Sequence, residues 1–164
     1  MYQKAIKVNP EGMEAYFGKA SSLSEAGDFD NSLTYYQTAL ALNPENASIH
    51  NNIGFAKFRV EKYEAAIPDF ELAIKLSPDD AYPYNNLGFA YYKLGKLDLA
   101  LEKINHSIFL DKGNSFAYKN RALVQIANSQ MELACADLDK AEKYGFAAMY
   151  GNEVEELRKQ YCLP

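Results

Sequence analysis

Apolar side chains recur at spacings of three and four residues along most of the chain, which is the period of an amphipathic α-helix. The segment 81–110 shows this pattern clearly. Tyr84 and Leu87 share one helical face in its first half, and apolar residues from Leu97 onward repeat in the same way in its second half. Gly95 interrupts the pattern between the two halves, as glycine does between helices. The pattern therefore predicts two helices joined by a short turn.

The same arrangement returns every 34 residues. Pro10, Pro44 and Pro78 follow one another at this interval, and each ends an apolar run. Further columns keep one kind of residue at the same spacing: Gly54 and Gly88; Asn52, Asn86 and Asn120; Ala66, Ala100 and Ala134; Tyr16, His50, Tyr84 and Tyr118. One helix pair cannot bury both of its apolar faces, so neighbouring pairs must stack into a solenoid.

These columns resemble the tetratricopeptide repeat (TPR) family, whose pattern runs from an aromatic residue through Leu-Gly, Tyr and Ala to Phe and Pro. The match is fullest over 81–110, where the family positions are filled by Tyr84, Leu87, Gly88, Tyr91 and Ala100. The resemblance implies an all-α, right-handed superhelical solenoid of antiparallel helix pairs with a C-terminal capping helix.

The repeat divides the chain into expected units. They are the second helix of a truncated repeat at 1–10, TPR 1 at 13–46, TPR 2 at 47–80, TPR 3 at 81–114, TPR 4 at 115–146, and a capping helix at 147–164. Lys19 and Arg121 occupy a column that is apolar in the middle units, and we expect them to weaken the first and last units. Pro68 falls within a predicted helix and is a candidate for a kink.

The charge of the chain narrows the classes of partner. Lys and Arg number 17 and Asp and Glu 22, so the net charge is −5, whereas nucleic-acid-binding domains present a basic surface. No stretch approaches the roughly 18 consecutive apolar residues of a membrane-spanning helix, and the first residues lack the apolar run of a signal peptide. We expect a soluble protein without nucleic-acid binding or membrane insertion. Its compartment stays open, with the cytoplasm slightly favoured.

Residues for catalysis or metal binding are sparse. We expect His50 to pack in its helix pair, and His106 has no second His or Cys close in sequence, as a metal site would need. Cys135 lies between two alanines and is expected to be a small buried side chain; a disulfide with Cys162 requires an oxidising compartment and stays open. The sequence predicts no enzyme, no cofactor and no metal site.

The resemblance implies that the first helix of each unit lines a concave groove, where peptides bind. An asparagine ladder at Asn52, Asn86 and Asn120 would serve there, because an amide both donates and accepts hydrogen bonds with any peptide backbone. Alternatively, these amides stabilise neighbouring helices. The complete expected peptide-binding set is Asn51, Asn52, Phe55, Arg59, Tyr82, Asn85, Asn86, Phe89, Tyr92, Lys93, Phe116, Lys119, Asn120 and Leu123.

The other members of this set supply apolar contact and charge. Exposed aromatic side chains often mark interaction surfaces, because each buries a large apolar area when a partner binds. Alternatively, the aromatic rings of this set pack between neighbouring first helices as part of the core. Arg59, Lys93 and Lys119 make the groove slightly cationic, which suits a mildly acidic ligand. The set that clamps a chaperone's terminal carboxylate in some TPR proteins is absent, because Tyr82 and Asn86 stand where Lys and Arg are needed.

Our leading hypothesis is a non-catalytic interaction module that binds a peptide segment of a partner protein in the concave groove. The alternative is a scaffold that self-associates into homo-oligomers through its open repeat ends, with Tyr2–Val8 seeking a partner helix. The sequence does not identify the partner, because one fold serves many recognition tasks.

Overall fold

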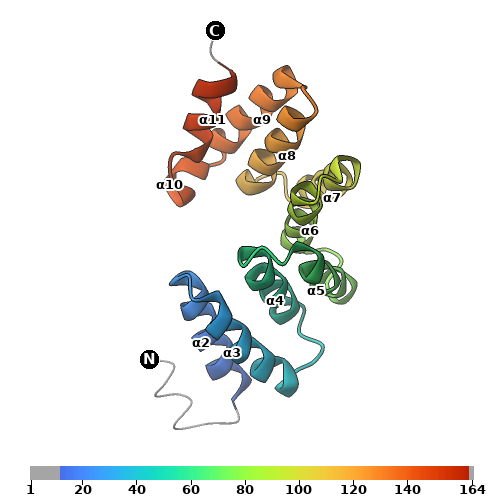
Figure 1. The fold of residues 1–164 in the computed structure, drawn as a ribbon, viewed down its shortest axis with the longest axis vertical. Coiled ribbons are helices and arrows are strands. Elements are labelled where there is room, and N and C mark those ends of the chain that lie inside the picture. Colours follow the sequence, from blue (N-terminus) through green and yellow to red (C-terminus); the bar gives the residue numbers. More distant parts are fainter. Residues whose placement is uncertain (1–11, 163–164) are drawn as a thin grey trace. The chain divides into compact units, whose positions relative to one another are not determined.

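The computed structural model describes residues 12–162, in which helices predominate and no strand occurs. The chain forms two compact units, Met1–Pro78 and Asp79–Pro164, and Figure 1 shows helices packed in consecutive pairs within each. The prediction of an all-α fold built from helix pairs is confirmed. The helix predicted at 1–10 lies outside the described residues.

The first unit contains two helix pairs. Its helices are α2 (Met13–Glu25), α3 (Phe29–Leu42), α4 (Ala47–Arg59) and α5 (Tyr63–Leu76). Helix α2 packs on α3, α3 on α4, and α4 on α5. Tyr36, Ile49 and Ile53 form part of the buried cluster between them. Pro68 lies inside α5, which continues on both sides of it.

The second unit repeats this plan and adds a cap. Its paired helices are α6 (Ala81–Lys93), α7 (Leu97–Leu110), α8 (Ser115–Ala127) and α9 (Met131–Lys143), followed by α10 (Phe146–Tyr150) and α11 (Glu153–Tyr161). Helix α6 packs on α7, α7 on α8, and α8 on α9, while α10 and α11 pack on α9. Ile104, Val124 and Leu138 are fully buried in the core of this unit.

Helix starts follow the 34-residue register. Side-chain oxygens of Asn46, Asp80 and Asn114 accept hydrogen bonds from backbone amides in the first turns of α4, α6 and α8, at 3.0–3.1 Å. Each such cap satisfies an amide that has no partner within its own helix. A short polar side chain, placed every 34 residues, therefore begins three of the first helices.

The turns inside the pairs follow the same register. Gly27, Glu61, Gly95 and Ser129 all have positive φ, between 59° and 82°. Glycine adopts this left-handed conformation without steric cost, whereas other residues resist it. In two of the four helix pairs, the turn therefore contains a residue that does not favour the required left-handed backbone conformation.

Close helix contact depends on the small residues of the repeat. A Cβ atom placed on Gly88 would lie 2.6 Å from Cγ1 of Ile104 and 3.0 Å from the carbonyl oxygen of Ala100. These distances leave no room for a side chain, so α6 approaches α7 through a glycine. Gly88 and Ala100, two small residues of the repeat columns, therefore lie where the two backbones come close together.

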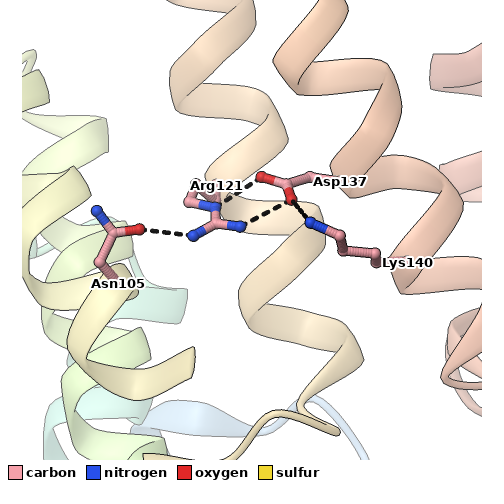
Figure 2. Close-up of polar contacts among 4 residues, drawn as sticks. All are labelled: Asn105, Arg121, Asp137 and Lys140. Atoms are coloured by element: carbon pink, nitrogen blue, oxygen red, sulfur yellow. Dashed lines mark hydrogen bonds and ion pairs between the residues drawn. The ribbon is translucent and has the colours of Figure 1, made fainter. Parts of the chain in front are cut away.

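Arg121 occupies an apolar column of the repeat, and a polar network accommodates it. Its Nε and Nη2 donate to the two carboxylate oxygens of Asp137 at 2.6 and 2.8 Å, and its Nη1 donates to Asn105 at 2.7 Å (Figure 2). Lys140 also lies 3.3 Å from Asp137. Because Asn105 belongs to α7 and Asp137 to α9, Arg121 ties α8 to both of its neighbours.

The cap differs from the single helix predicted over 147–164, within the described part that ends at residue 162. The structure has two helices, α10 and α11, because Gly151 adopts φ 87° and ψ −159°, a conformation essentially restricted to glycine. Phe146 and Val154 are buried and close the apolar core of the second unit. The capping position is thus filled by a short helix, a sharp turn and a second helix.

Candidate functional site

A pocket of about 360 Å³ lies in the first unit. Its lining comes from three helices and consists of Ser21, Ser24 and Glu25 of α2, Tyr36 of α3, and Asn52, Phe55 and Arg59 of α4. The three α4 residues belong to the predicted peptide-binding set, and the three α2 residues come from the matching part of the preceding repeat. The structure therefore gathers predicted residues from one helix around a common hollow.

Hydroxyl groups and an amide converge on Tyr36 in this pocket. Tyr36 is 2% exposed, and its hydroxyl lies 3.2 Å from Ser21 Oγ, where either oxygen can donate. Burial raises the pKa of Tyr36, while hydrogen bonds with Ser21, Ser24 and Asn52 act in the opposite direction. The pocket therefore has neutral polar groups that both donate and accept hydrogen bonds.

Arg59 is held by aromatic rings. Its guanidinium carbon lies 4.6 Å from the ring centroid of Phe29 and 5.7 Å from that of Phe55. These two rings meet edge to face with centroids 6.4 Å apart. Attraction between a cation and an aromatic face favours this placement, so Arg59 is positioned by its own unit before any ligand arrives.

The second unit presents aromatic surface on α6. Tyr82 is 60% exposed, and the rings of Phe89 and Tyr92 stack with centroids 5.6 Å apart. The Lys93 ammonium lies 5.5 Å from the Phe89 centroid, and burial raises the pKa of Tyr92. Phe89 and Tyr92 are half-buried, so these rings combine a packing role with accessible surface.

Three predicted residues are buried inside the second unit. Asn120 donates to Asn85 at 3.0 Å, and the two side chains are 0% and 2% exposed. The ammonium of Lys119, which is 4% exposed, lies 3.2 Å from Glu153 Oε1. Burial lowers the pKa of Lys119, and the Glu153 carboxylate opposes that shift. These groups join neighbouring helices, the alternative that the sequence left open, and their contact with a ligand stays a prediction.

The remaining predicted residues are half-buried. Phe116 packs against Phe146 and Tyr150 of α10, with centroids 5.4 and 4.6 Å away. Asn51, Asn86 and Leu123 are also half-buried. The asparagine ladder thus has three different environments: Asn52 in the pocket, Asn86 half-buried on α6, and Asn120 buried against Asn85.

Sequence reasoning missed Tyr36 and Phe29 as members of the site. Tyr36 lies in a core column that holds Phe70, Ile104 and Leu138 in the later repeats. Its hydroxyl was the available signal, because a tyrosine in such a column needs a polar partner. No pattern in the sequence relates Phe29 to Arg59, since their contact depends on the packing of α3 beside α4.

The cysteines and histidines have structural contacts. Cys135 and Cys162 form a disulfide that joins α9 to the end of α11, which corrects the expectation of a small buried thiol at Cys135. The bend at Gly151 brings Cys162 close to Cys135. The helical pattern of the sequence did not predict that bend. His50 is buried, and its Nε2 lies 2.9 Å from the Pro44 carbonyl oxygen. The ring centroids of His106 and Tyr84 are 4.3 Å apart.

Residues 12–162 contain neither a cluster of metal ligands nor a membrane-spanning helix. No three His, Cys, Asp or Glu side chains in this range are grouped as a metal site would require. None of the helices in the same range has the length and apolar character needed to cross a membrane.

Comparison with protein families gives matches over more than half of the chain. Profiles described as "TPR repeat" match residues 20–60 and 61–95, and one described as "Tetratricopeptide repeat" matches residues 81–113. No curated protein matches the chain.

Solved structures resemble the fold. TTC0263, a thermophilic TPR protein in Thermus thermophilus, aligns with TM-score 0.81 at 19% identity over 98% of this chain and 84% of its own. MamA aligns with TM-score 0.73 at 23% identity, over 98% and 88%. The first TPR of Spaghetti (RPAP3), bound to the HSP90 peptide SRMEEVD, aligns with TM-score 0.67 at 23% identity, over 71% and 93%. At these identities the likeness concerns the fold.

Proposed function

Because the chain belongs to the tetratricopeptide repeat family, we propose that it binds a peptide segment of a partner protein on the exposed side of its first helices. TPR folds serve protein–protein interaction, and the groups around the α4 pocket suit recognition. In this proposal the chain performs no chemical reaction on its partner.

The α2–α4 pocket carries the proposal. It offers a hollow of about 360 Å³ whose lining combines Asn52 with an aromatic ring at Phe55 and a cation at Arg59. A peptide has backbone amides and carbonyls to satisfy and side chains to bury. An amide can meet the first need, and an aromatic surface beside a polar floor meets the second.

Within the second unit, α6 supplies the corresponding contacts. Tyr82, Phe89, Tyr92 and Lys93 present aromatic area with one ammonium group. The first TPR of Spaghetti (RPAP3), which is bound to an HSP90 peptide, supports the idea that this fold accepts a peptide. In the proposed complex the accessible residues contact the ligand, whereas the buried Asn85, Lys119 and Asn120 stabilise the fold.

A display screen of random peptides on the purified chain tests this function. The wild type would be compared with Asn52→Ala/Phe55→Ala, and with Lys75→Ala, an exposed change on α5, as a matched control. We expect enriched peptides that the control still selects and the double variant loses. Helix content, measured by circular dichroism, should be nearly unchanged in all three proteins.

Light scattering on the same samples addresses the alternative, a self-associating scaffold. The helix that motivated it, Tyr2–Val8, lies outside the described residues. If no peptide is enriched and the measured mass is a multiple of 18.4 kDa, the hypothesis of peptide binding is rejected in favour of self-assembly. Enriched peptides that the double variant selects equally well would remove the pocket from the proposal.

A further inference from the structure

We propose that the pocket of the first unit receives an acidic side chain of the partner segment, with Arg59 as its anchor. The inference rests on the proposed function and adds to it the chemistry of the ligand. It concerns one carboxylate, bound at one place, in a protein whose net charge is −5.

Arg59 differs from the other arginines of the chain in what surrounds it. Arg121 pairs with Asp137, and Arg158 pairs with Asp139 and Glu142. Within residues 12–162 no carboxylate lies within ion-pair distance of the Arg59 guanidinium, whose recorded contacts are the rings of Phe29 and Phe55. A carboxylate of a ligand would give Arg59 the ion-pair partner that Arg121 and Arg158 have in this chain.

The N–H donors of Arg59 are available to a ligand. The side chain is exposed, and its guanidinium contacts the rings of Phe29 and Phe55, which offer no hydrogen-bond acceptor of the carboxylate kind. Those N–H groups match the two oxygens of a carboxylate and bind them with paired, charge-assisted hydrogen bonds. Because Phe29 and Phe55 already hold the side chain, less rotamer freedom is lost on binding.

The pocket floor complements a carboxylate with neutral donors. Hydroxyls of Ser21, Ser24 and Tyr36 and the amide of Asn52 lie in the same pocket as Arg59. One proton of the Ser21 and Tyr36 hydroxyls is engaged in the hydrogen bond between them, and the remaining hydroxyl protons and the Asn52 amide can donate to an oxygen that Arg59 leaves unsatisfied. A buried acceptor that finds such donors does not incur the penalty of an unpaired polar group.

Glu25 limits how much negative charge the pocket accepts. It lines the same pocket as Arg59, and its carboxylate also acts on Tyr36, whose pKa it raises. A second acid, or a doubly charged phosphate, would meet repulsion from Glu25, whereas a basic neighbour would be attracted to it. The preferred segment therefore has a single acidic residue next to a basic one.

The test uses the most strongly enriched peptide of the display screen, synthesised with a blocked amino terminus and an amidated carboxyl terminus. A second version carries Gln in place of its acidic residue, and a third has a free carboxyl terminus. Each is titrated against the full chain, Arg59→Gln and Lys62→Gln. Lys62 is an exposed cation three positions away, so its variant is the matched charge control.

We expect the acid-to-Gln peptide to bind the wild type about tenfold more weakly, as loss of a charge-assisted hydrogen bond would produce. The same change should have little effect on binding to Arg59→Gln, because the carboxylate has lost its anchor there. Lys62→Gln should behave like the wild type. In the screen itself, Glu25→Gln should select peptides with more acidic residues.

Two kinds of failure are distinguishable. If no peptide is enriched, the proposed function fails and the inference falls with it. If peptides bind but tolerate the acid-to-Gln change, or weaken equally with Lys62→Gln and Arg59→Gln, only the acidic anchor is overturned. Binding restricted to the peptide with a free carboxyl terminus overturns the side-chain assignment and identifies the terminal carboxylate as the bound group.

Discussion

Lys119 and Glu153 lie at the same position of the 34-residue register, and their side chains meet at 3.2 Å. Lys119 belongs to the first helix of the last pair, and Glu153 begins α11. The cap therefore continues the register of the repeats and supplies the counter-charge for a lysine that would otherwise be buried without an anion.

Replacing Glu153 by Gln should lower the free energy of unfolding by about 1–2 kcal/mol, because the Lys119 ammonium loses its partner. The loss is smaller than for a fully buried pair because the Glu153 side chain is 51% exposed and solvent screens it. Urea denaturation measures the change. Glu156→Gln removes the same charge from an exposed position of α11, and an equal loss in that variant would contradict the assignment.

Breaking the network of Arg121 should be more costly. Arg121→Leu leaves the carboxylate of Asp137, 3% exposed, with Lys140 as its one cationic partner among residues 12–162, and we expect a loss of about 3 kcal/mol. Arg121→Leu/Asp137→Leu should recover part of that loss because no buried charge is stranded. A double-mutant cycle measures the coupling, and strictly additive effects would show that the two side chains do not depend on each other.

The fold was largely predictable because the register repeats. Each column of glycine, alanine or aromatic residues marks the same helix–helix contact in successive repeats, so several independent positions predict the same packing. The break at Gly151 was not predictable in this way, since it occurs once and has no counterpart in the other units. Arg121 was expected to weaken its unit, but Asp137, one helix further along, compensates for it.

The turns inside the helix pairs provide a stability test. Glu61→Gly and Ser129→Gly should each raise the free energy of unfolding by roughly 0.5–1 kcal/mol, because both residues have positive φ and glycine relieves that strain. Gly95→Ala should have the opposite effect. Lys62→Gly is the control, since Lys62 has φ −85°; stabilisation by this variant as well would argue against the backbone explanation.

Removing the disulfide should destabilise the oxidised protein. Cys135→Ser/Cys162→Ser removes a cross-link between residues 27 positions apart. The unfolded chain then regains conformational entropy that corresponds to about 3.5 kcal/mol. Chemical denaturation with and without a reductant is the measurement. The reduced wild type should unfold like the double variant, and a wild type indifferent to reductant would mean that the two thiols are not joined.

Alkaline pH should weaken the first unit through Tyr36. Burial raises the pKa of this phenol in the folded state, so its contribution to stability is complete below about pH 10 and is lost as pH rises above that value. The free energy of unfolding of Tyr36→Phe should fall less steeply across this range than that of the wild type. Parallel curves for the two proteins would assign the alkaline loss to other groups, such as Tyr92 and Tyr118, whose pKa values are also raised.

The candidate site was less predictable than the fold. Asn52, Phe55 and Arg59 lie on one helix, as the helical spacing predicts, but a column of the repeat does not show what covers each of its members. Asn120 shares a column with Asn52, yet it is buried against Asn85 while Asn52 lines a pocket. Exposure at a given column depends on what covers it, and those neighbours differ from one repeat to the next.

The link between Cys135 and Cys162 determines how the last repeat would carry tension. A force applied beyond Cys162 passes through the sulfur atoms directly to the first turns of α9. The backbone of α10 and α11 then bears no load, and a protease cut at the Gly151 bend would leave the two pieces attached. The capping helices are thereby isolated from a force applied at Cys162, and α9 is the last helix of the repeats that bears this force.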